Sequence, residues 1–367
     1  MAGTKIVQVV MGLTAEEVAA LQNKICPEAG RLCLARYELL RAVHFAQPIG
    51  RRALAERLHL QERRVRRELA LLGQRELVKI GGLGVELTPE GEATLWRLEE
   101  YVRVLRGLSR WEKELCLRFG LREAIIVPGD SDADLAVKKE LARVTAEYLR
   151  KHLKDGAILA VTGGTTLAEV AAALRPAEER RDLLVLPARG GLGEEVELQA
   201  NTIAAAFAKG LGGTYRLLHV PDDLDPETLQ RIAGEPRVKE LVELIRRADL
   251  LLHGIGVAEE MARRRGMPPE AVAELLAKGA VGEAFGYYFD EDGRLVHTTS
   301  SVGIQEKDLP GIGLVVMVGG GRSKARAARA ILKSGGRHVI ITDEALARQL
   351  LGKEAAAPTT RAAEGGV

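Results

Sequence analysis

Cysteine is scarce in this sequence, and long apolar runs are missing. Only three cysteines occur, Cys26, Cys33 and Cys116, and no two of them form a CxxC pair. An odd number without that spacing argues against a disulfide framework and against a zinc site built from cysteines. No apolar run approaches the ~20 residues that a membrane-spanning helix needs, and the N-terminus lacks the pattern of a signal peptide. These absences predict a cytoplasmic protein with no membrane partner.

Acidic residues are few in one part of the chain. Residues 31–80 contain twelve Lys and Arg, eleven of them Arg, against five Glu and no Asp, a local balance of +7. The whole chain carries a net charge of +2, so the remainder sums to −5. A basic segment joined to a mildly acidic body is typical of a nucleic-acid-binding protein. A solvated helix face would give the same count, so the pattern within the segment must decide.

The basic segment has the pattern of three helices followed by two short strands. Apolar residues recur at helical spacing, and a glycine-rich turn separates the two strands. The predicted helices cover residues 32–45, 51–58 and 61–73, and the strands lie within 77–87. This order is that of a winged helix-turn-helix, whose second paired helix enters the major groove of DNA.

The third of these helices carries arginines on the face opposite its apolar stripe of Val65, Leu69 and Leu72. An RNA partner is disfavoured because no aromatic stacking platform lies near this helix. A solvated face is the alternative to DNA binding, but only two glutamates balance four arginines there. Candidates for base or phosphate contact are Arg63, Arg64 and Arg67, whereas Arg51, Arg52 and Lys79 are expected to hold the DNA backbone.

A strand, a glycine turn and a helix follow one another at residues 157–174. The apolar run 158–161 predicts a buried strand, and Gly163-Gly164-Thr165-Thr166 opens an amphipathic helix. Glycine lets a ligand approach the backbone closely, and the N–H groups of a first helical turn favour an anion. The pattern therefore predicts a phosphate-binding turn. An ordinary turn with a threonine N-cap is the alternative.

The same order recurs at residues 312–333, where the loop Gly319–Lys324 adds two cations and Ser323 to its glycines. Two further strand-to-glycine junctions lie at 183–193 and 250–256. Repeated units of this kind predict a parallel, Rossmann-like sheet in an α/β fold, with ligands beyond the carboxyl ends of the strands. Two phosphate-type loops on one edge predict a ligand with two phosphates, or with one phosphate and a polar sugar.

Other polar residues are weaker candidates. The alternating aspartates of 129–134 lack the glycine and the bidentate glutamate of an EF-hand, so we expect a solvated, helix-capping loop and no metal site. Amides open the helix predicted over 197–208 and either bind sugar hydroxyls or only cap it. His253 is expected to be structural. Glu283, at the start of a hairpin with an Asp-Gly turn, is placed to accept from a sugar hydroxyl.

From about residue 37 to 350 the sequence resembles the SorC/DeoR class of bacterial transcriptional repressors, and within it the repressors of glycolytic genes. The stretches that carry the resemblance are 47–52, 129–132, 161–166, 187–193, 199–203, 213–218, 253–256, 283–289, 323–325 and 342–344. At Arg322 the sequence departs from the pattern, which has a small residue there. The resemblance implies an effector domain similar to the phosphosugar isomerase and deaminase fold, with fructose 1,6-bisphosphate as inducer.

The resemblance also implies roles for individual residues. One phosphate would be held by Gly163, Gly164, Thr165 and Thr166, and Lys324 with Ser323 would bind phosphate as well. Arg189, Gln199 and Glu283 would contact phosphate or sugar hydroxyls. No catalytic residue, metal or cofactor is expected. The alternative is a phosphosugar isomerase- or deaminase-like enzyme with an accessory DNA-binding module. It is disfavoured because the loops at 163–166 and 253–256 contain no acidic residue, and Glu283, the one plausible base, has no visible partner in the sequence.

The expected organisation has five parts: an N-terminal helical extension (1–30), a winged helix-turn-helix domain (31–106), a helical linker (107–120), a sugar-phosphate effector domain (121–352) and a disordered tail (353–367). The expected partners are operator DNA with palindromic or repeated half-sites, a sugar-phosphate effector and further copies of the chain in a homo-dimer or tetramer.

Overall fold

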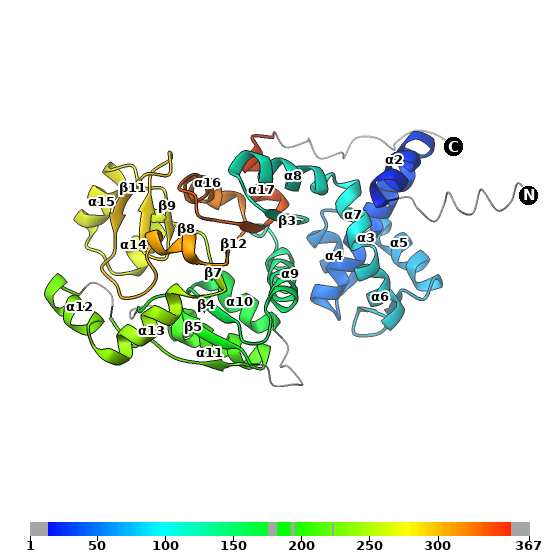
Figure 1. Ribbon diagram of the computed structural model, residues 1–367. Helices are drawn as coiled ribbons and strands as arrows, with labels where there is room; N and C mark the ends of the chain where they lie inside the picture. The colour runs from blue at the N-terminus through cyan, green and yellow to red at the C-terminus, as the bar shows by residue number, and fades with distance from the viewer. Residues whose placement is uncertain (1–13, 175–181, 192–194, 222–223, 354–367) are drawn as a thin grey trace, which may run out of the picture. The chain divides into compact units, whose positions relative to one another are not determined.

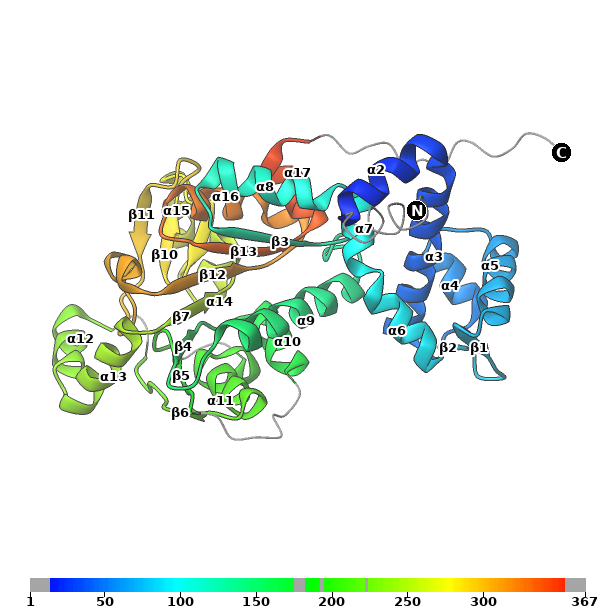
Figure 2. The same ribbon diagram turned by 45° about the vertical axis from the view of Figure 1, so that its right-hand side comes forward.

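The structure is a computed structural model that describes residues 14–174, 182–191, 195–221 and 224–353 (Figures 1 and 2). The first thirteen residues, the end of the glycine junction at 192–193 and the tail after Lys353 lie outside the described residues. The chain divides into two compact units, 1–110 and 111–367. Within the described ranges, no helix has both the length and the apolar character needed to cross a membrane.

The N-terminal unit is mainly helical. Its α2 begins with a capping box between Thr14 and Glu17, as its sequence predicts. The helix α3 begins at Pro27, so the expected boundary at residue 30 falls inside it. The elements are α2 (Ala15–Ile25), α3 (Pro27–Ala46), α4 (Arg51–Arg57), α5 (Glu62–Gln74), β1 (Val78–Ile80), β2 (Val85–Leu87), α6 (Pro89–Arg97) and α7 (Glu99–Leu105), and α8 (Leu108–Phe119) leads into the second unit.

The predicted winged helix-turn-helix is confirmed in this unit. The side chains of Val65, Leu69 and Leu72 on α5 are buried, as their spacing predicts. They join one apolar cluster with residues of α3, α4 and the two strands. The strands β1 and β2 form an antiparallel hairpin, which is the wing. The core therefore fixes α5 against α4 and leaves the arginine-bearing face outside.

The sequence after Thr88, whose apolar residues Leu95, Leu98, Val102 and Leu105 are spaced as in one long helix, forms α6 and α7 with a break at Leu98. Backbone hydrogen bonds continue on both sides, from Leu98 N–H to the Thr94 carbonyl and from Val102 N–H to the Leu98 carbonyl. Leu95 and Val102 are both fully buried in the cluster of this unit. The apolar stripe thus packs on its own unit across the break.

The second unit is built on a seven-stranded sheet in which every pairing is parallel. Its order is β3-β13-β12-β7-β4-β5-β6. The strands are β3 (Glu123–Val127), β4 (Ile158–Val161), β5 (Leu184–Pro187), β6 (Thr214–Tyr215), β7 (Leu250–His253), β12 (Leu314–Val318) and β13 (Val339–Asp343). The predicted parallel α/β fold is confirmed.

Helices cover both faces of this sheet. Figures 1 and 2 show α9 (Leu135–His152), α10 (Thr165–Ala173) and α11 (Ala200–Leu211) together along one face. On the opposite side lie α8, α16 (Ala325–Lys333) and α17 (Glu344–Leu351). Alternate strand residues share the core with α9, α10 and α11, among them Leu159, Val161, Leu250, Leu252, Val316 and Val318. A strand alternates its side chains between faces, so a strand covered on both faces is mostly apolar, with polar residues such as His253 and Asp343 at the carboxyl ends.

A four-stranded antiparallel sheet adjoins the main one, in the order β11-β10-β9-β8. Its strands are β8 (Gly256–Val257), β9 (Gly282–Ala284), β10 (Tyr287–Phe289) and β11 (Leu295–Thr298). The hairpin predicted here is correct for β10 and β11, but a second tight turn at Phe285-Gly286 adds β9. Beside it lie α14 (Ala258–Arg264) and α15 (Pro269–Ala277), and α12 (Pro226–Ala233) and α13 (Pro236–Arg246) precede β7.

The strand order of the main sheet reverses between β4 and β7. From β4 the chain continues outward to β5 and β6, and then it returns to β7 on the other side of β4. Open parallel sheets bind ligands at such a switch point, beyond the carboxyl ends of the strands. The fold therefore places the candidate site next to residues 162–166 and 254–256.

Candidate functional sites

The basic face of the N-terminal unit presents all six residues predicted to contact DNA. Arg63, Arg64 and Arg67 are exposed on α5, opposite its buried stripe. The other three, Arg51 and Arg52 of α4 and Lys79 of β1, are exposed as well. The structure therefore gathers cations on the helix pair and the wing, as contact with a phosphate backbone requires.

Two of these arginines have carboxylate partners. Arg52 lies 3.5 Å from Glu62, and Arg67 lies 3.4 Å from Glu68. Glu68 is itself held by Arg36 at 2.9 Å, so it is only partly available to Arg67. Within the described ranges, Arg63 and Arg64 form no ion pair. Their positive charge is therefore less compensated than that of Arg67.

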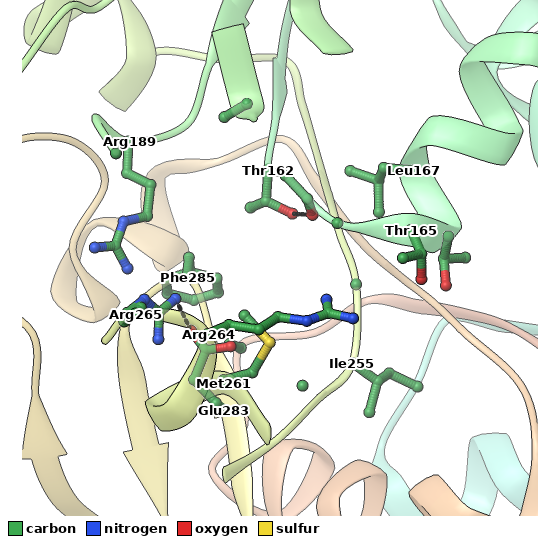
Figure 3. Close-up of a pocket in the computed structure, with 18 of the residues that line it drawn as sticks. Thr162, Thr165, Leu167, Arg189, Ile255, Met261, Arg264, Arg265, Glu283 and Phe285 are labelled. Atoms are coloured by element: carbon green, nitrogen blue, oxygen red, sulfur yellow. Dashed lines mark hydrogen bonds and ion pairs between the residues drawn. The ribbon is translucent and has the colours of Figure 1, made fainter. Parts of the chain in front are cut away.

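A pocket of about 220 Å³ lies at the switch point of the main sheet (Figure 3). Loops after β4, β5 and β7 contribute to its wall, together with α14 and the turn between β9 and β10. Eight of the nine predicted effector-binding residues line it: Gly163, Gly164, Thr165, Thr166, Arg189, Gln199, Glu283 and Lys324. The ninth, Ser323, lies outside.

The turn after β4 has the geometry predicted for an anion cradle. A Cβ atom on Gly163 would lie 2.5 Å from the carbonyl oxygen of Leu198, so this position has no room for a side chain. Gly164 has φ +113°, a conformation that side-chain-bearing residues rarely adopt, and it caps α10 without a side-chain hydrogen bond. The first N–H groups of α10 therefore face the pocket beside the hydroxyls of Thr165 and Thr166.

Arg189 is buried at the end of β5 and is held by the segment that precedes η2 (Glu306–Gly311). Its backbone forms a β-bridge with Gly303, and the next residue, Gly190, donates its N–H to Val302. Its guanidinium lies so close to Gly286 that a Cβ there would be 2.1 Å from Nη1. In Figure 3 Arg189 and Thr165 lie on opposite sides of the pocket. Positive charge is thus available well away from the glycine turn.

The arginines of α14 were missed from the sequence. Arg264 is exposed, lines the pocket and extends across it in Figure 3. Arg265 also lines the pocket, but it donates to Glu283 at 2.9 Å and to the hydroxyl of Tyr288 at 2.7 Å. The only sequence signal was the run Arg263–Arg265 after the glycine junction 254–256, which reads equally well as the charged end of a helix.

Glu283 has a structural role in the wall of the pocket. Its carboxylate is buried, pairs with Arg265 and accepts the backbone N–H of Gly286. This arrangement closes the turn between β9 and β10 and fixes Phe285 at the pocket wall. The structure places this predicted carboxylate in the pocket wall, and its ion-pair partner was not foreseen.

Lys324 is the one residue of the second glycine loop that reaches the pocket. Within the described residues, its ammonium group forms no hydrogen bond or ion pair. Burial lowers the pKa of Lys324 below its ordinary value, and the carboxylate of Glu260 opposes this shift. The positive charges of Lys138 and Arg264 lower the pKa of Lys324 further. An anionic ligand beside Lys324 would stabilise its charged form and raise its pKa again.

The second glycine loop is not the phosphate cradle that its sequence predicts. Asp132 accepts hydrogen bonds from the N–H and the hydroxyl of Ser323, and Asp130 pairs with Arg322 at 2.7 Å. Asp343 accepts from the N–H of Gly321 at 2.7 Å. The glycines make room for carboxylates, since a Cβ on Gly321 would lie 2.2 Å from Asp132. The aspartate loop 129–134 is therefore bound to this loop, although Asp132 and Ala133 stay exposed and Asp134 caps α9, as expected.

Two other candidates are structural. Asn201 exchanges two hydrogen bonds with the backbone of Leu218, at 2.9 and 3.1 Å. The helix predicted over 197–208 is in fact η1 (Val196–Leu198) followed by α11, with Gln199 at the joint.

His253 is fully buried, and its Nδ1 bonds to the carbonyl of Gly254 at 2.8 Å. Burial, with the charge of Arg337, lowers the pKa of His253 to about 3.

Comparison with protein families assigns both units. The family described as "Putative sugar-binding domain" matches residues 104–352, and the CggR N-terminal DNA binding domain matches residues 33–102. The central glycolytic genes regulator of Bacillus subtilis is 44% identical over 333 residues, which cover 91% of this chain and 98% of the relative.

Solved structures agree with this assignment. A SorC family transcriptional regulator from Enterococcus faecalis is 41% identical, with a TM-score of 0.62, over 66% of this chain and 99% of that one. The full-length sorbitol operon regulator SorC from Klebsiella pneumoniae covers 88% of this chain and 99% of its own, with a TM-score of 0.60. Its identity of 19% supports likeness of fold alone.

Proposed function

Because the chain belongs to the SorC family of transcriptional regulators, together with the central glycolytic genes regulator, we propose that it is a repressor of glycolytic genes released from its operator by a phosphorylated sugar. The matched relatives are transcriptional regulators and a DNA-binding domain is present, so the chain is a regulator and not an enzyme. Its operator would be cytoplasmic DNA, contacted by α5 in the major groove and by α4 and the wing along the backbone.

The observation that carries this proposal is the set of residues that line the pocket. A glycine turn at a helix N-terminus and four cations, Arg189, Arg264, Arg265 and Lys324, surround one small cavity at the switch point of the sheet. Such a wall suits a small ligand that bears phosphate. Catalysis by isomerases and deaminases needs a positioned acid or base, and Glu283 is already engaged with Arg265.

Fructose 1,6-bisphosphate is the effector that we favour. One phosphate would sit on the turn Gly163–Thr166. The second would lie among the remaining cations, where Arg189 and Arg264 extend from different elements (Figure 3). The polar groups of Gln199 and Glu283 would face the sugar hydroxyls. Because Ser323 is bound to Asp132, Lys324 alone would serve the ligand from the second glycine loop.

Thermodynamic linkage couples effector binding to release from operator DNA. If the effector weakens operator binding by some factor, the operator must weaken effector binding by the same factor. The protein would bind two-fold or repeated half-sites as a homo-dimer or tetramer, since paired recognition helices match a palindromic operator. Effector binding would then favour an assembly in which paired α5 helices no longer match the half-site spacing.

The test uses the full chain and an operator fragment selected from a random-sequence pool. Fluorescence anisotropy would measure DNA affinity with no sugar, with fructose 1,6-bisphosphate and with fructose 6-phosphate, and calorimetry would measure binding of each sugar. We expect tight operator binding that only the bisphosphate weakens. Equal effects of the two sugars would reject the bisphosphate, and DNA affinity unchanged by every sugar phosphate would reject effector control.

A further inference from the structure

The tip of the wing exposes a large apolar side chain. Leu83 is 89% exposed, the highest value for a large apolar residue in the described part of the chain, and Ile80 is 51% exposed. Gly81 and Gly84 exchange backbone hydrogen bonds, so Gly82 and Leu83 form a two-residue loop between β1 and β2. Three glycines around one leucine make a narrow turn with no charged residue in it.

This tip is held rigidly against the DNA-binding helices. Val85 forms a β-bridge with Ile49, whose two hydrogen bonds are 2.9 and 3.1 Å long. Gly84 has φ +142°, and a Cβ there would lie 2.9 Å from the backbone of Ile49, so only glycine permits this approach. Ile49 immediately precedes the N-cap of α4. Leu83 therefore has a fixed position relative to α4, which packs on α5.

Single exposed leucines are common on protein surfaces, so exposure alone does not identify a partner. Here the leucine stands on a narrow turn at the end of a wing, and the exposed Lys79 lies on the first strand of the same hairpin. The minor groove of DNA is about 6 Å wide, with apolar sugar walls. Architectural proteins insert leucine and similar side chains there and bend the duplex.

We propose that Leu83 is an apolar wedge that enters the minor groove beside the major-groove site of α5 and bends the operator there. The inference rests on the proposed function, because it requires that α5 bind DNA. It adds a second reading element, one that favours flexible pyrimidine–purine steps over stiff A-tracts at the position of the wing. It also separates two roles in the wing, since Lys79 supplies charge and Leu83 supplies apolar contact.

The first experiment compares Leu83→Ser with Leu117→Ser on the selected operator. Leu117 on α8 is 87% exposed and serves as the matched control. We expect about tenfold weaker binding for Leu83→Ser, the size of losing a buried leucine side chain, and no change for Leu117→Ser. The slope of log affinity against log salt should be unchanged in Leu83→Ser, whereas Lys79→Ala should reduce it by about 0.9.

A second measurement reports the bend itself. Energy transfer between dyes at the two ends of the operator should show a smaller bend with Leu83→Ser, and Leu83→Met should restore the bend of the unmodified chain. A Leu83→Ser variant with full affinity and a full bend would overturn the inference and leave the repressor proposal standing. A change in assembly state without DNA would assign Leu83 to a contact between copies instead. Failure of the unmodified chain to bind any selected DNA would overturn both proposals.

Discussion

The carboxylate of Asp132 accepts two hydrogen bonds from Ser323, one from its N–H at 2.8 Å and one from its hydroxyl at 3.1 Å. Anions are favoured where the backbone N–H groups at the start of a helix point outward. Here the carboxylate of Asp132 already provides that anion. The next residue, Lys324, is left to reach the pocket. Asp132 therefore removes Ser323 from the site while it positions the lysine.

We expect Lys324→Ala to keep operator affinity and to weaken effector binding by about tenfold or more, the size of a hydrogen bond to a charged group. The pKa of free Lys324 is lowered by burial, and bound phosphate would raise it, so binding should take up protons. Effector affinity should fall as the pH rises above the lowered pKa of Lys324 in the ligand-free protein and approaches 10.5, the ordinary value for lysine. Calorimetry above pH 8, where phosphate no longer titrates, measures this uptake in buffers of different ionisation enthalpy.

The control for this prediction is Lys333→Ala, which removes an exposed lysine of α16 that lies outside the pocket. It should leave both effector affinity and proton uptake unchanged. Equal loss of DNA binding and effector binding in Lys324→Ala would mean that the lysine is structural. Proton uptake that persists in Lys324→Ala would assign the titrating group elsewhere.

The two glycine loops look alike in the sequence, yet only the turn at Gly163-Gly164 has its glycines in the pocket wall. Strand, glycine turn and helix are local patterns, and this is why the parallel sheet and the turn at Gly163-Gly164 could be predicted. What fills each turn depends on distant residues, and Asp132 lies 191 positions from Ser323. The spacing of the aspartates carried no sign of that partner. The hydroxyl of Ser323 and the cation of Lys324 therefore suggested a bound phosphate. In the structure the carboxylate of Asp132 takes that place beside Ser323.

The ion pair of Glu283 was missed for the same reason. A carboxylate between small residues could be seen in the sequence, but its partner Arg265 belongs to another element. The run Arg263–Arg265 reads as the ordinary charged end of a helix, and only the fold turns Arg264 and Arg265 towards the pocket. The winged helix was easier to predict, because its apolar spacing and its arginines lie within one continuous segment.

The ion pair of Arg265 with Glu283 leads to a stability prediction. Their side chains are 10% and 4% exposed, so Glu283→Ala would leave a buried positive charge with only the hydroxyl of Tyr288 as partner. We expect a loss of about 3–5 kcal/mol in the free energy of unfolding. The double variant Glu283→Leu with Arg265→Met should be less destabilised than the sum of the single changes. Urea unfolding of the full chain, followed on the transition of the second unit, measures both.

The same helix offers the matched control. Arg263 and Glu259 are paired at 2.8 Å, but their side chains are 64% and 48% exposed. Solvent screens such a pair, so Glu259→Ala should cost less than about 1 kcal/mol. If Glu283→Ala proved as mild as Glu259→Ala, water would have to reach Arg265, and the closed turn at Gly286 could not be the resting state of the pocket.

His253 should make the stability of the second unit depend on pH. Burial, helped by the charge of Arg337, lowers its pKa in the folded protein to about 3, while the unfolded chain keeps the ordinary 6.5. Below pH 6.5 the unfolded state binds a proton that the folded state excludes, so the free energy of unfolding falls as pH falls from 6.5 to about 3. The slope contributed by one such group approaches about 1.4 kcal/mol per pH unit.

The informative window is pH 6.5 to 5, because most carboxylates begin to titrate below it. In that window His253→Gln should flatten the fall in unfolding free energy, whereas His59→Gln, at an exposed position of the N-terminal unit, should leave it unchanged. A fall that persists in His253→Gln would place the titrating group elsewhere. A flattened fall would mean that the strand leading into Gly254 and the pocket depends on a neutral imidazole, whose Nδ1–H holds the Gly254 carbonyl in place. Acid would then loosen the pocket through His253, since the turn Gly163–Thr166 has no titratable side chain.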